Sequence, residues 1–337
     1  MTEVTSDDDR GEGRFRASQV LGADEIRGLC QASDLRGLLA VATTWAMIAG
    51  AFALVARWPG PLTVLLALIL LGGRHLALAV LMHEASHRTL CRTRWLNDAV
   101  GLWLCAYPAW QDTRRYREQH LAHHAHTGSA RDPDLDLVRP FPCSRRALAR
   151  KLARDLLGIS GLRRIVGLLL MDLGYIEYTT SGGARPIPGA RERPLAAILR
   201  TGLDNLHGVI LVNAALFGVT WSFGHPELFL LWVASWLTTY SLFLRVRAIA
   251  EHACTPDRGD PLGNTRTVLA SPLARLTVAP HRVSYHLEHH LLMSVPFFQL
   301  PRLHALLGAR GVLARAPVAR SYLAVLRLAS AGPQGDA

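Results

Sequence analysis

Four long apolar runs constrain the fold of this chain more than any other feature of its sequence. Residues 38–56 are 19 residues without a charged side chain, which as a helix would extend about 28 Å and cross one hydrocarbon core. We predict membrane-spanning helices at about 38–56, 62–82, 206–223 and 228–244. Short links containing Gly and Pro, RWPGP and GHPE, join these runs in two pairs. The sequence therefore predicts an all-α membrane protein with four transmembrane helices in two hairpins.

The distribution of basic residues predicts how these helices are oriented. The chain has 37 Lys and Arg residues and a formal net charge of +11. Segments 1–37, 83–200 and 245–337 carry 5, 19 and 11 of them, whereas the two hairpin tips carry only Arg57. The positive-inside rule places these three segments in the cytoplasm. We expect an integral protein of the bacterial inner membrane, in contact with membrane lipid and not with nucleic acid, because the charges flank apolar runs instead of forming a soluble basic stripe.

We expect one membrane domain with a segment on each side of it. Residues 1–36 begin with MTEVTSDDDRGEGR, an acidic sequence typical of disorder, and are predicted to be cytosolic. Residues 37–320 form the membrane domain, and 321–337 form a C-terminal tail. Two amphipathic stretches, 95–110 and 159–176, are predicted to lie in the membrane interface. In the first of them the aromatic residues expected at headgroup level are Trp95, Trp103, Tyr107 and Trp110.

Histidine is concentrated in three short motifs, HEASH at 83–87, HLAHH at 120–124 and HLEHH at 286–290. Helical residues at i, i+3 and i+4 share a face, so each motif directs at least two rings to one point. Adjacent histidines point about 100° apart on a helix, which suits two metals better than one. With a further histidine after the fourth apolar run, we predict a dimetal site in a cytosolic helical cap. Its candidate ligands are His83, His87, His120, His123, His124, His252, His286, His289 and His290.

The residues around these motifs leave several assignments open. Imidazole suits iron, zinc or copper, so the donor type does not select the metal. Glu84, Glu251 and Glu288 lie beside candidate ligands; they either hold the rings in place or are solvated charges on a helix. The histidines outside the repeating pattern are expected to be ordinary surface or core residues: His126, His207, His225, His281 and His304.

The three motifs, in this order between two membrane hairpins, resemble the integral-membrane fatty acid desaturase and hydroxylase superfamily. The likeness extends through ALAVLMHEASHRTL, YREQHLAHHAHTGSARDPDL and YHLEHHLLMSVPFFQLPRLH. It implies a cytoplasmic di-iron site bound by the nine histidines, with O₂ as co-substrate and two external electrons. Without a His-Pro-Gly-Gly haem motif in the chain, those electrons are expected from a separate donor protein of ferredoxin or cytochrome type.

One position departs from the pattern of the acyl-CoA branch of this superfamily. That branch has an Asn four residues before the histidine that corresponds to His252, and this chain has Ala248 there. In that branch the Asn supports the site through a water molecule, so the resemblance leaves this support in question here. His281 is the candidate substitute, and His126 is a further candidate near the metals.

The resemblance implies desaturation of a fatty acyl chain, carried as a lipid or a thioester, and three alternatives remain. The first is hydroxylation, or desaturation of a small non-acyl metabolite. The second is an intramembrane zinc protease, because HEASH also satisfies the H-E-x-x-H signature. The third is a metal carrier, which the few polar residues within the spans do not favour. Two irons per chain would favour the oxygenase, and one zinc would favour the protease.

The candidates for substrate binding are Arg74, His75 and Trp110. An ionisable residue within an apolar run is a functional hypothesis by default. Arg74 either extends to the interface or holds an anionic substrate group near the metals. If it holds the substrate, replacing it with Leu raises KM and leaves the bound metal intact.

Overall fold

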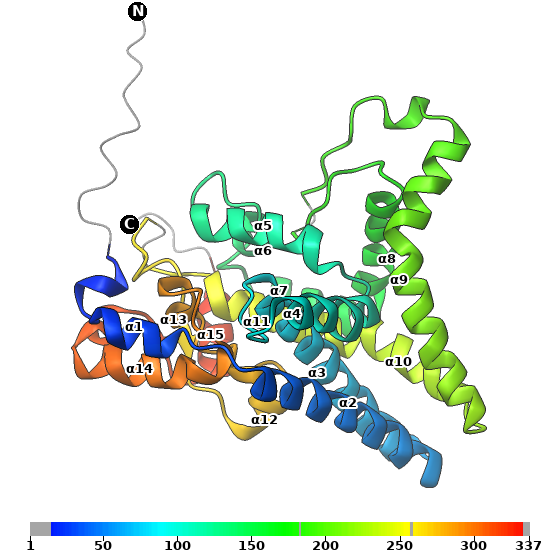
Figure 1. The fold of residues 1–337 in the computed structure, drawn as a ribbon, viewed down its shortest axis with the longest axis horizontal. Coiled ribbons are helices and arrows are strands. Elements are labelled where there is room, and N and C mark those ends of the chain that lie inside the picture. The colour runs from blue at the N-terminus through cyan, green and yellow to red at the C-terminus, as the bar shows by residue number, and fades with distance from the viewer. Residues whose placement is uncertain (1–14, 182, 257–258, 333–337) are drawn as a thin grey trace, which may run out of the picture.

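The computed structural model describes residues 15–332 apart from 182, 257 and 258, and most of these residues are helical (Figure 1). In chain order the elements are η2 (Ala17–Gln19), α1 (Ala23–Leu29), α2 (Asp34–Arg57), α3 (Pro61–Ser86), α4 (Arg94–Val100), η3 (Gly101–Ala106), η4 (Tyr107–Ala109), α5 (Thr113–His126), α6 (Leu135–Val138), α7 (Arg145–Leu156), α8 (Ile159–Asp172), η5 (Ala190–Glu192), α9 (Leu195–Ser222), α10 (Glu227–Leu237), α11 (Thr239–His252), β1 (Thr267–Val268), α12 (Pro272–Leu276), η6 (Pro280–Arg282), α13 (His286–Leu291), η7 (Phe297–Gln299), α14 (Leu300–Ala309), η8 (Val312–Arg315), β2 (Val318–Ala319) and α15 (Tyr322–Ala329).

Four helical stretches are long and apolar enough to cross a membrane, and each contains one of the four predicted spans to within a residue: Ala23–Arg57, Pro61–Ser86, Leu195–Ser222 and Glu227–His252. Helix α2 begins at Asp34 after Ser33, whose side chain accepts a hydrogen bond from the Arg36 amide. Helix α3 begins with Pro61, a residue favoured at the first helical position. Because α3 continues to Ser86, beyond the predicted end at 82, it carries His83 and Glu84 on its last turn.

The fourth predicted span, at 228–244, is not one straight helix. It consists of α10 and α11, which meet at Thr238 with φ −107° and ψ −87°. At this break the Thr239 hydroxyl donates to the Leu68 carbonyl at 2.6 Å. A Cβ atom added at Gly72 would lie 2.2 Å from the Thr239 hydroxyl, so only glycine permits this approach of α11 to α3. The close packing at Gly72 explains how the kinked helix is held against its neighbour.

Helices α2, α3 and α10 share one apolar core, which contains Ile48, Phe52, Leu71 and Trp232. Helix α9 contributes only the partly buried Leu216 to the border of this core and stands at the edge of the molecule in Figure 1. Much of its apolar surface is exposed, including Leu203, which is 65% exposed. Such a surface is unfavourable in water but suits lipid, where apolar side chains need no protein partner.

The stretch predicted to lie in the interface at 95–110 forms α4, the π-helical turn η3 and the short η4. Trp95 and Trp103 are exposed, as an interfacial position requires. Tyr107 differs from this prediction because it is 1% exposed. Its ring packs on α9, where a Cβ atom at Gly208 would lie only 2.0 Å from it. Tyr107 therefore packs α9 against the rest of the protein and does not face the lipid headgroups.

Both segments that flank the predicted membrane domain contain helices, and the prediction of disorder needs correction for residues 15–36. Residues 1–14 lie outside the described residues, but 15–36, predicted to be disordered, contain η2, α1 and the start of α2. They are ordered because Leu21 and Leu29 are buried against Leu262 and Leu303. The predicted tail at 321–337 also contains a helix, α15, whose Val325 and Ala329 are buried in a core shared with α11.

The chain also departs slightly from an all-α fold. Strands β1 and β2, of two residues each, pair in parallel, with Thr267 opposite Val318 and Val268 opposite Ala319. This pairing ties the segment before the third histidine motif to the segment before α15. The helical packing decides the architecture, and the two strands join its C-terminal elements.

Arg74 lies on α3 and is 5% exposed. Its guanidinium donates to the Leu276 carbonyl at 2.8 Å, at the end of α12, and contacts the sulfur of Met47 at 3.3 Å. These contacts give Arg74 a role in packing, and its role in substrate binding stays a prediction. We expect Arg74→Leu to lower the midpoint of thermal unfolding, because the Leu276 carbonyl loses its charged donor, a contact worth about 1.5–3 kcal/mol. The measurement is thermal unfolding in detergent beside steady-state kinetics, and a raised KM with an unchanged midpoint would instead support substrate binding.

Candidate metal centre

The nine histidines of the predicted site come from four separate parts of the chain. His83 lies on the last turn of α3, and His87 follows that helix directly. Helix α5 contributes three rings, α11 ends with His252, and α13 contributes three more. Asp112 starts α5 in the required orientation, because its carboxylate accepts from the amides of Arg114 and Arg115. The structure thus brings together rings separated by up to about 200 residues along the sequence.

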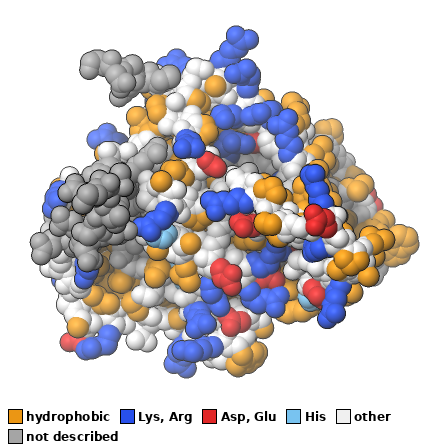
Figure 2. Space-filling model, turned by 90° about the horizontal axis from the view of Figure 1, so that it is seen from above, with side chains coloured by type: hydrophobic (Ala, Val, Ile, Leu, Met, Phe, Trp, Pro, Cys, Tyr) orange, Lys and Arg blue, Asp and Glu red, His pale blue; other side chains and the backbone are white. Residues whose placement is uncertain are grey.

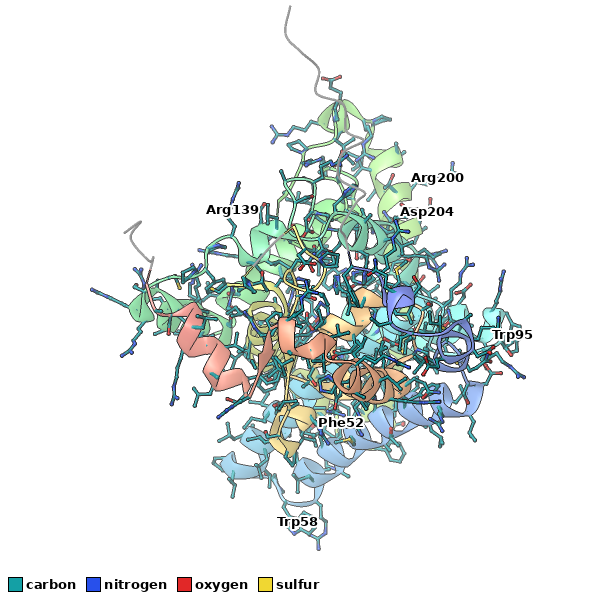
Figure 3. All side chains as sticks on the ribbon, turned by 90° about the vertical axis from the view of Figure 1, so that its left-hand side faces the viewer. Phe52, Trp58, Trp95, Arg139, Arg200 and Asp204 are labelled. Carbon is teal, nitrogen blue, oxygen red and sulfur yellow. The ribbon has the colours of Figure 1, made fainter. Side chains whose placement is uncertain are left out.

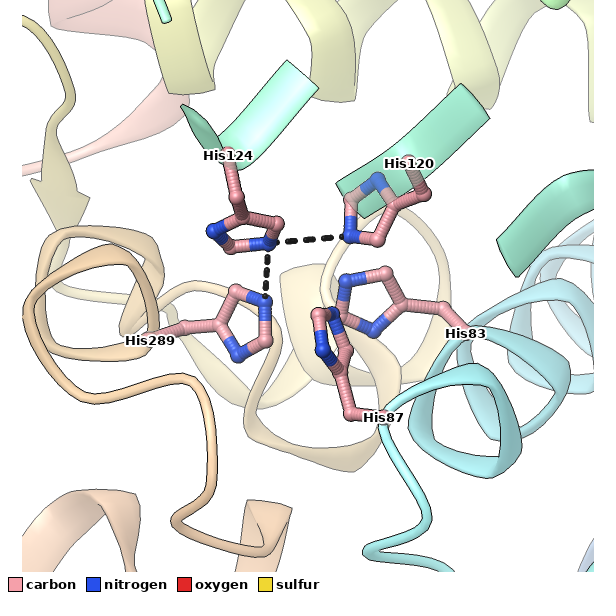
Figure 4. Close-up of side chains that lie close together, drawn as sticks. All are labelled: His83, His87, His120, His124 and His289. Atoms are coloured by element: carbon pink, nitrogen blue, oxygen red, sulfur yellow. Dashed lines mark hydrogen bonds between the residues drawn. The ribbon is translucent and has the colours of Figure 1, made fainter. Parts of the chain in front are cut away.

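These rings form two groups, and within each group the candidate ligand nitrogens lie within 4.8 Å of one another. The first group, shown in Figure 4, has five members: His83, His87, His120, His124 and His289. The second has four members: His123, His252, His286 and His290. Each adjacent pair of histidines is divided between the groups, as the helical rotation of about 100° per residue dictates. The helical motifs of α5 and α13 therefore each serve both groups.

Within each group, ring nitrogens face one another at short distances. In the first, His124 Nε2 lies 3.0 Å from His120 Nε2 and 3.1 Å from His289 Nε2 (Figure 4). In the second, His286 Nε2 lies 2.8 Å from His252 Nε2. In such a contact one neutral imidazole donates its N–H proton and the other accepts it with the lone pair of one nitrogen. The other unprotonated ring nitrogens of the cluster are then left without a hydrogen-bond donor.

The unpartnered nitrogens show that the donor set fits metal ions. The buried ring nitrogens without a hydrogen-bond partner are both nitrogens of His83, Nε2 of His87 and His290, and Nδ1 of His286 and His289, whose Nε2 atoms face other rings of the cluster. Burying a polar atom without a partner costs about 1–3 kcal/mol, so this many in one place is unfavourable for a structural cluster. Lone pairs that converge on two centres are what a pair of imidazole-bound metal ions requires. Five nitrogens would hold one ion and four would hold the other.

Burial keeps most of these rings neutral. It lowers the pKa of His124 to about 2 and that of His87 to about 4. It also holds the pKa of His120, His289 and His290 well below the ordinary value, helped by repulsion from the neighbouring rings. A metal binds only the unprotonated nitrogen. At neutral pH the site is therefore ready to bind metal without losing protons first.

His123 is the exception, because a carboxylate holds its outer nitrogen. Burial alone would lower the pKa of His123, but Asp132 and Asp134 outweigh it and raise that pKa. The Asp132 carboxylate accepts from His123 Nδ1 at 2.8 Å and from the amides of Gly128 and Asp134, both at 2.9 Å. This bond fixes the proton on Nδ1 and directs Nε2 into the second group. The sequence reasoning missed Asp132, although its motif, DPDL, was part of the resemblance.

The three glutamates predicted beside the ligands behave differently from one another. Glu84 lies 3.6 Å from His83 Nδ1, and Glu251 lies 3.5 Å from His286 Nδ1 while it accepts from Arg247 at 2.6 Å. Glu288, in contrast, accepts from His304 Nδ1 at 2.6 Å and from the Thr267 hydroxyl. Glu288 therefore holds α13 against α14 and β1 and does not hold a cluster ring. His304, which was expected to be an ordinary histidine, is its partner.

The remaining candidates lie away from the two groups. His281 Nε2 is 3.0 Å from the Thr44 hydroxyl of α2, and His126 belongs to neither group. His75 is fully buried; its Nε2 lies 3.1 Å from the Trp232 carbonyl and its ring 3.7 Å from the Trp232 ring. Trp110 donates to Asp172 at 2.9 Å and lines a small cavity with polar neighbours: Gln111, Asp112, Arg115, Asp172, Tyr178 and Asn205.

Comparison with known proteins places the chain in a family. The model of the family described as fatty acid desaturase matches residues 58–322, so the chain belongs to this family of oxidoreductases. It is 27% identical over 290 residues to the dihydrorhizobitoxine desaturase of Bradyrhizobium elkanii, and this match covers 80% of this chain and 76% of that protein. It is 26% identical over 241 residues to an omega-6 fatty acid desaturase of the endoplasmic reticulum (isozyme 1) of Glycine max, which covers 65% of this chain and 58% of that protein. It is 27% identical over 231 residues to the beta-carotene ketolase of a Paracoccus strain, which covers 66% of this chain and 72% of that protein.

We expect Asp132→Asn to weaken metal binding in the second group by about 10–100-fold, because an amide no longer fixes the proton on His123 Nδ1. The measurement is the metal content per chain after dialysis against a weak chelator. Asp136→Asn is the matched control, since Asp136 lies on the same segment but is half exposed and pairs only loosely with Arg139 at 3.7 Å. Equal metal retention in both variants would contradict the role given to Asp132.

The lowered pKa values also predict how the metal-free protein responds to acid. Below about pH 6.5 the unfolded chain protonates these imidazoles, whereas the folded chain does so only at lower pH. The unfolded state then binds more protons, so stability falls as the pH decreases. We expect the midpoint of thermal unfolding, measured without metal in detergent, to fall steadily between about pH 7 and about pH 5. A constant or rising midpoint would contradict the buried neutral state of the rings.

Proposed function

We propose that this protein is an O₂-dependent di-iron desaturase that receives electrons from a separate donor protein. The observation that carries the proposal is the pair of groups of five and four imidazoles, in a chain that belongs to the fatty acid desaturase family. Removing two hydrogens from adjacent carbons releases two electrons. Two further electrons and two protons from outside complete the reduction of O₂ to two waters. The donor requirement follows from this balance.

The roles of the protein's own residues follow from their contacts. When bound, the two iron ions would supply the oxidising power needed to break an unactivated C–H bond. The protein holds His123 through Asp132, and Glu84 and Glu251 lie 3.6 and 3.5 Å from Nδ1 of His83 and His286. Arg247 donates to Glu251 at 2.6 Å. Because Arg247 and Glu251 are both largely buried, each compensates part of the cost of burying the other. The chain thus contributes position, and the metals contribute the redox chemistry.

We further propose that the four spans cross the membrane as two hairpins and that the metal centre lies on the cytoplasmic side. Figure 3 supports this orientation, since Trp58, at the link between α2 and α3, lies at the opposite end of the molecule from Arg139 and Arg200. The basic segments then remain on one side, as the positive-inside rule requires. The exposed apolar face of α9 would contact lipid.

The proposed substrate is a fatty acyl chain carried as a lipid or a thioester. A small metabolite is the second candidate, because the relative from Bradyrhizobium elkanii, matched over 80% of this chain, is named for a substrate other than a fatty acid. Similarity to a ketolase keeps insertion of oxygen as a third outcome.

The test combines metal analysis with product analysis. We expect about two iron ions per chain, and about one after His289→Ala or His286→Ala, which remove a ligand from the first and second groups respectively. Expressed with a reduced ferredoxin system in a host of known lipid profile, the protein should yield a product two hydrogens lighter than its substrate. His225→Ala is the control, because His225 lies in the link between α9 and α10 and pairs with Glu227. One zinc per chain, or iron binding without O₂ consumption, would overturn the proposal.

A further inference from the structure

A cleft of about 480 Å³ leads from the surface to the metal centre. One wall is formed by residues 15–18 and by Ile26 of α1. The other wall is formed by Pro261 and the end of α13. The floor contains His124 and His290, so the cleft reaches candidate ligands directly. It lies apart from the cavity at Trp110, with which it shares no lining residue.

The two rings on the floor belong to different metal groups. His124 is in the group of five and His290 in the group of four, and their centroids are 4.2 Å apart with the planes tilted by only 25°. The other seven candidate ligands do not line the cleft. A molecule that enters the cleft therefore meets one ligand of each proposed metal at the same time.

The cleft reaches the outer edges of these rings and not their metal-binding nitrogens. His124 Nε2 is directed inward, towards His120 and His289 (Figure 4). His290 Nε2 is also buried, and its Nδ1 lies 3.3 Å from the Thr127 hydroxyl on the side of α5. A substrate must bring a C–H bond to the space between the inward nitrogens, which the rings block from this direction. An electron can pass through a ligand ring, so the cleft suits electron entry and not substrate entry.

The charge around the cleft indicates which carrier fits. The acidic residues of α1 are already paired, Asp24 with Arg27 and Glu25 with Arg310. Arg16 on the wall and Arg302 near Glu25 are exposed and have no acidic partner within 4 Å among the described residues. On the face of the molecule that Figure 2 shows, Lys and Arg side chains are more frequent than Asp and Glu side chains, in keeping with the formal net charge of +11. The complementary partner is an acidic protein, which such a field would attract and orient.

We propose that this cleft is the docking site of a small acidic one-electron carrier protein, which reduces the metal pair through the rings of His124 and His290. The inference rests on the proposed function and adds to it the place and the charge of the electron donor. Two reduced carriers bind in succession, and each leaves oxidised by one electron, so that the pair of metals gains the two external electrons that the reaction needs. Redox partners form small, short-lived interfaces, so the carrier needs only to cover the mouth of the cleft.

The test uses the full-length iron-loaded protein in detergent and measures the rate at which its ferric centre is reduced without O₂. The probes are a reduced plant-type [2Fe–2S] ferredoxin, which is acidic, and dithionite, which needs no docking site. We expect the double variant Arg16→Glu/Arg302→Glu to lower the second-order rate with ferredoxin at least about tenfold at low salt. The rate with dithionite should not change. Arg16→Lys/Arg302→Lys should restore the ferredoxin rate, because the charge is retained.

Arg200→Glu is the matched control, because Arg200 is exposed on α9, far from α1 (Figures 1 and 3). It makes the same change in net charge per site and should leave the ferredoxin rate near that of the unmodified protein. An equal loss in this control, an unchanged rate in the double variant, or a centre that dithionite reduces and ferredoxin does not would each overturn the docking proposal. A centre that dithionite fails to reduce would instead contradict the proposed di-iron function.

Discussion

The structure depends on keeping nine imidazoles together, mostly buried and uncharged. A protonated ring in this space would face several others within 5 Å and would lose its hydration, which explains why burial and mutual repulsion both lower the pKa of most of these histidines. The neutral rings in turn expose lone pairs that protein donors do not satisfy. A cluster of this kind is stable only if metal ions bind those lone pairs or if the packing of the surrounding helices keeps the rings in place.

The surrounding elements provide that packing through buried hydrogen bonds and ion pairs to glutamate carboxylates. Glu84 accepts from the Phe297 amide at 3.0 Å and so links the end of α3 to η7. The Glu251–Arg247 pair lies within α11 at 2.6 Å, and Glu288 ties α13 to His304 on α14. Each contact joins a ligand-bearing element to a neighbour or stiffens it. The positions of the rings are therefore set by the whole arrangement of helices and not by the three motifs alone.

Much of this arrangement could be predicted from local patterns. The four spans follow from the length of the apolar runs, and the division of each adjacent histidine pair follows from helical periodicity. Asp132 was missed because its role depends on the turn at 127–132, which brings a carboxylate nine residues away onto His123. The break at Thr238 was missed because hydropathy continues through it, whereas the kink depends on the close approach of Gly72 to Thr239 and of Gly161 to Leu237. Residues 15–36 were mispredicted because their few apolar side chains find partners more than 200 residues away.

The interleaving of the two histidine groups has a consequence for assembly. Helix α5 supplies His120 and His124 to one group and His123 to the other, and α13 divides its three rings in the same way. When either helix is oriented about its axis so that one ring lies in its own group, the adjacent ring of the same helix lies in the other group. The first ion to enter would rigidify both helices and leave the second position already formed, so occupancy of the two positions would rise together. In the unmodified protein a state with a single ion would then be less populated than two independent sites would give.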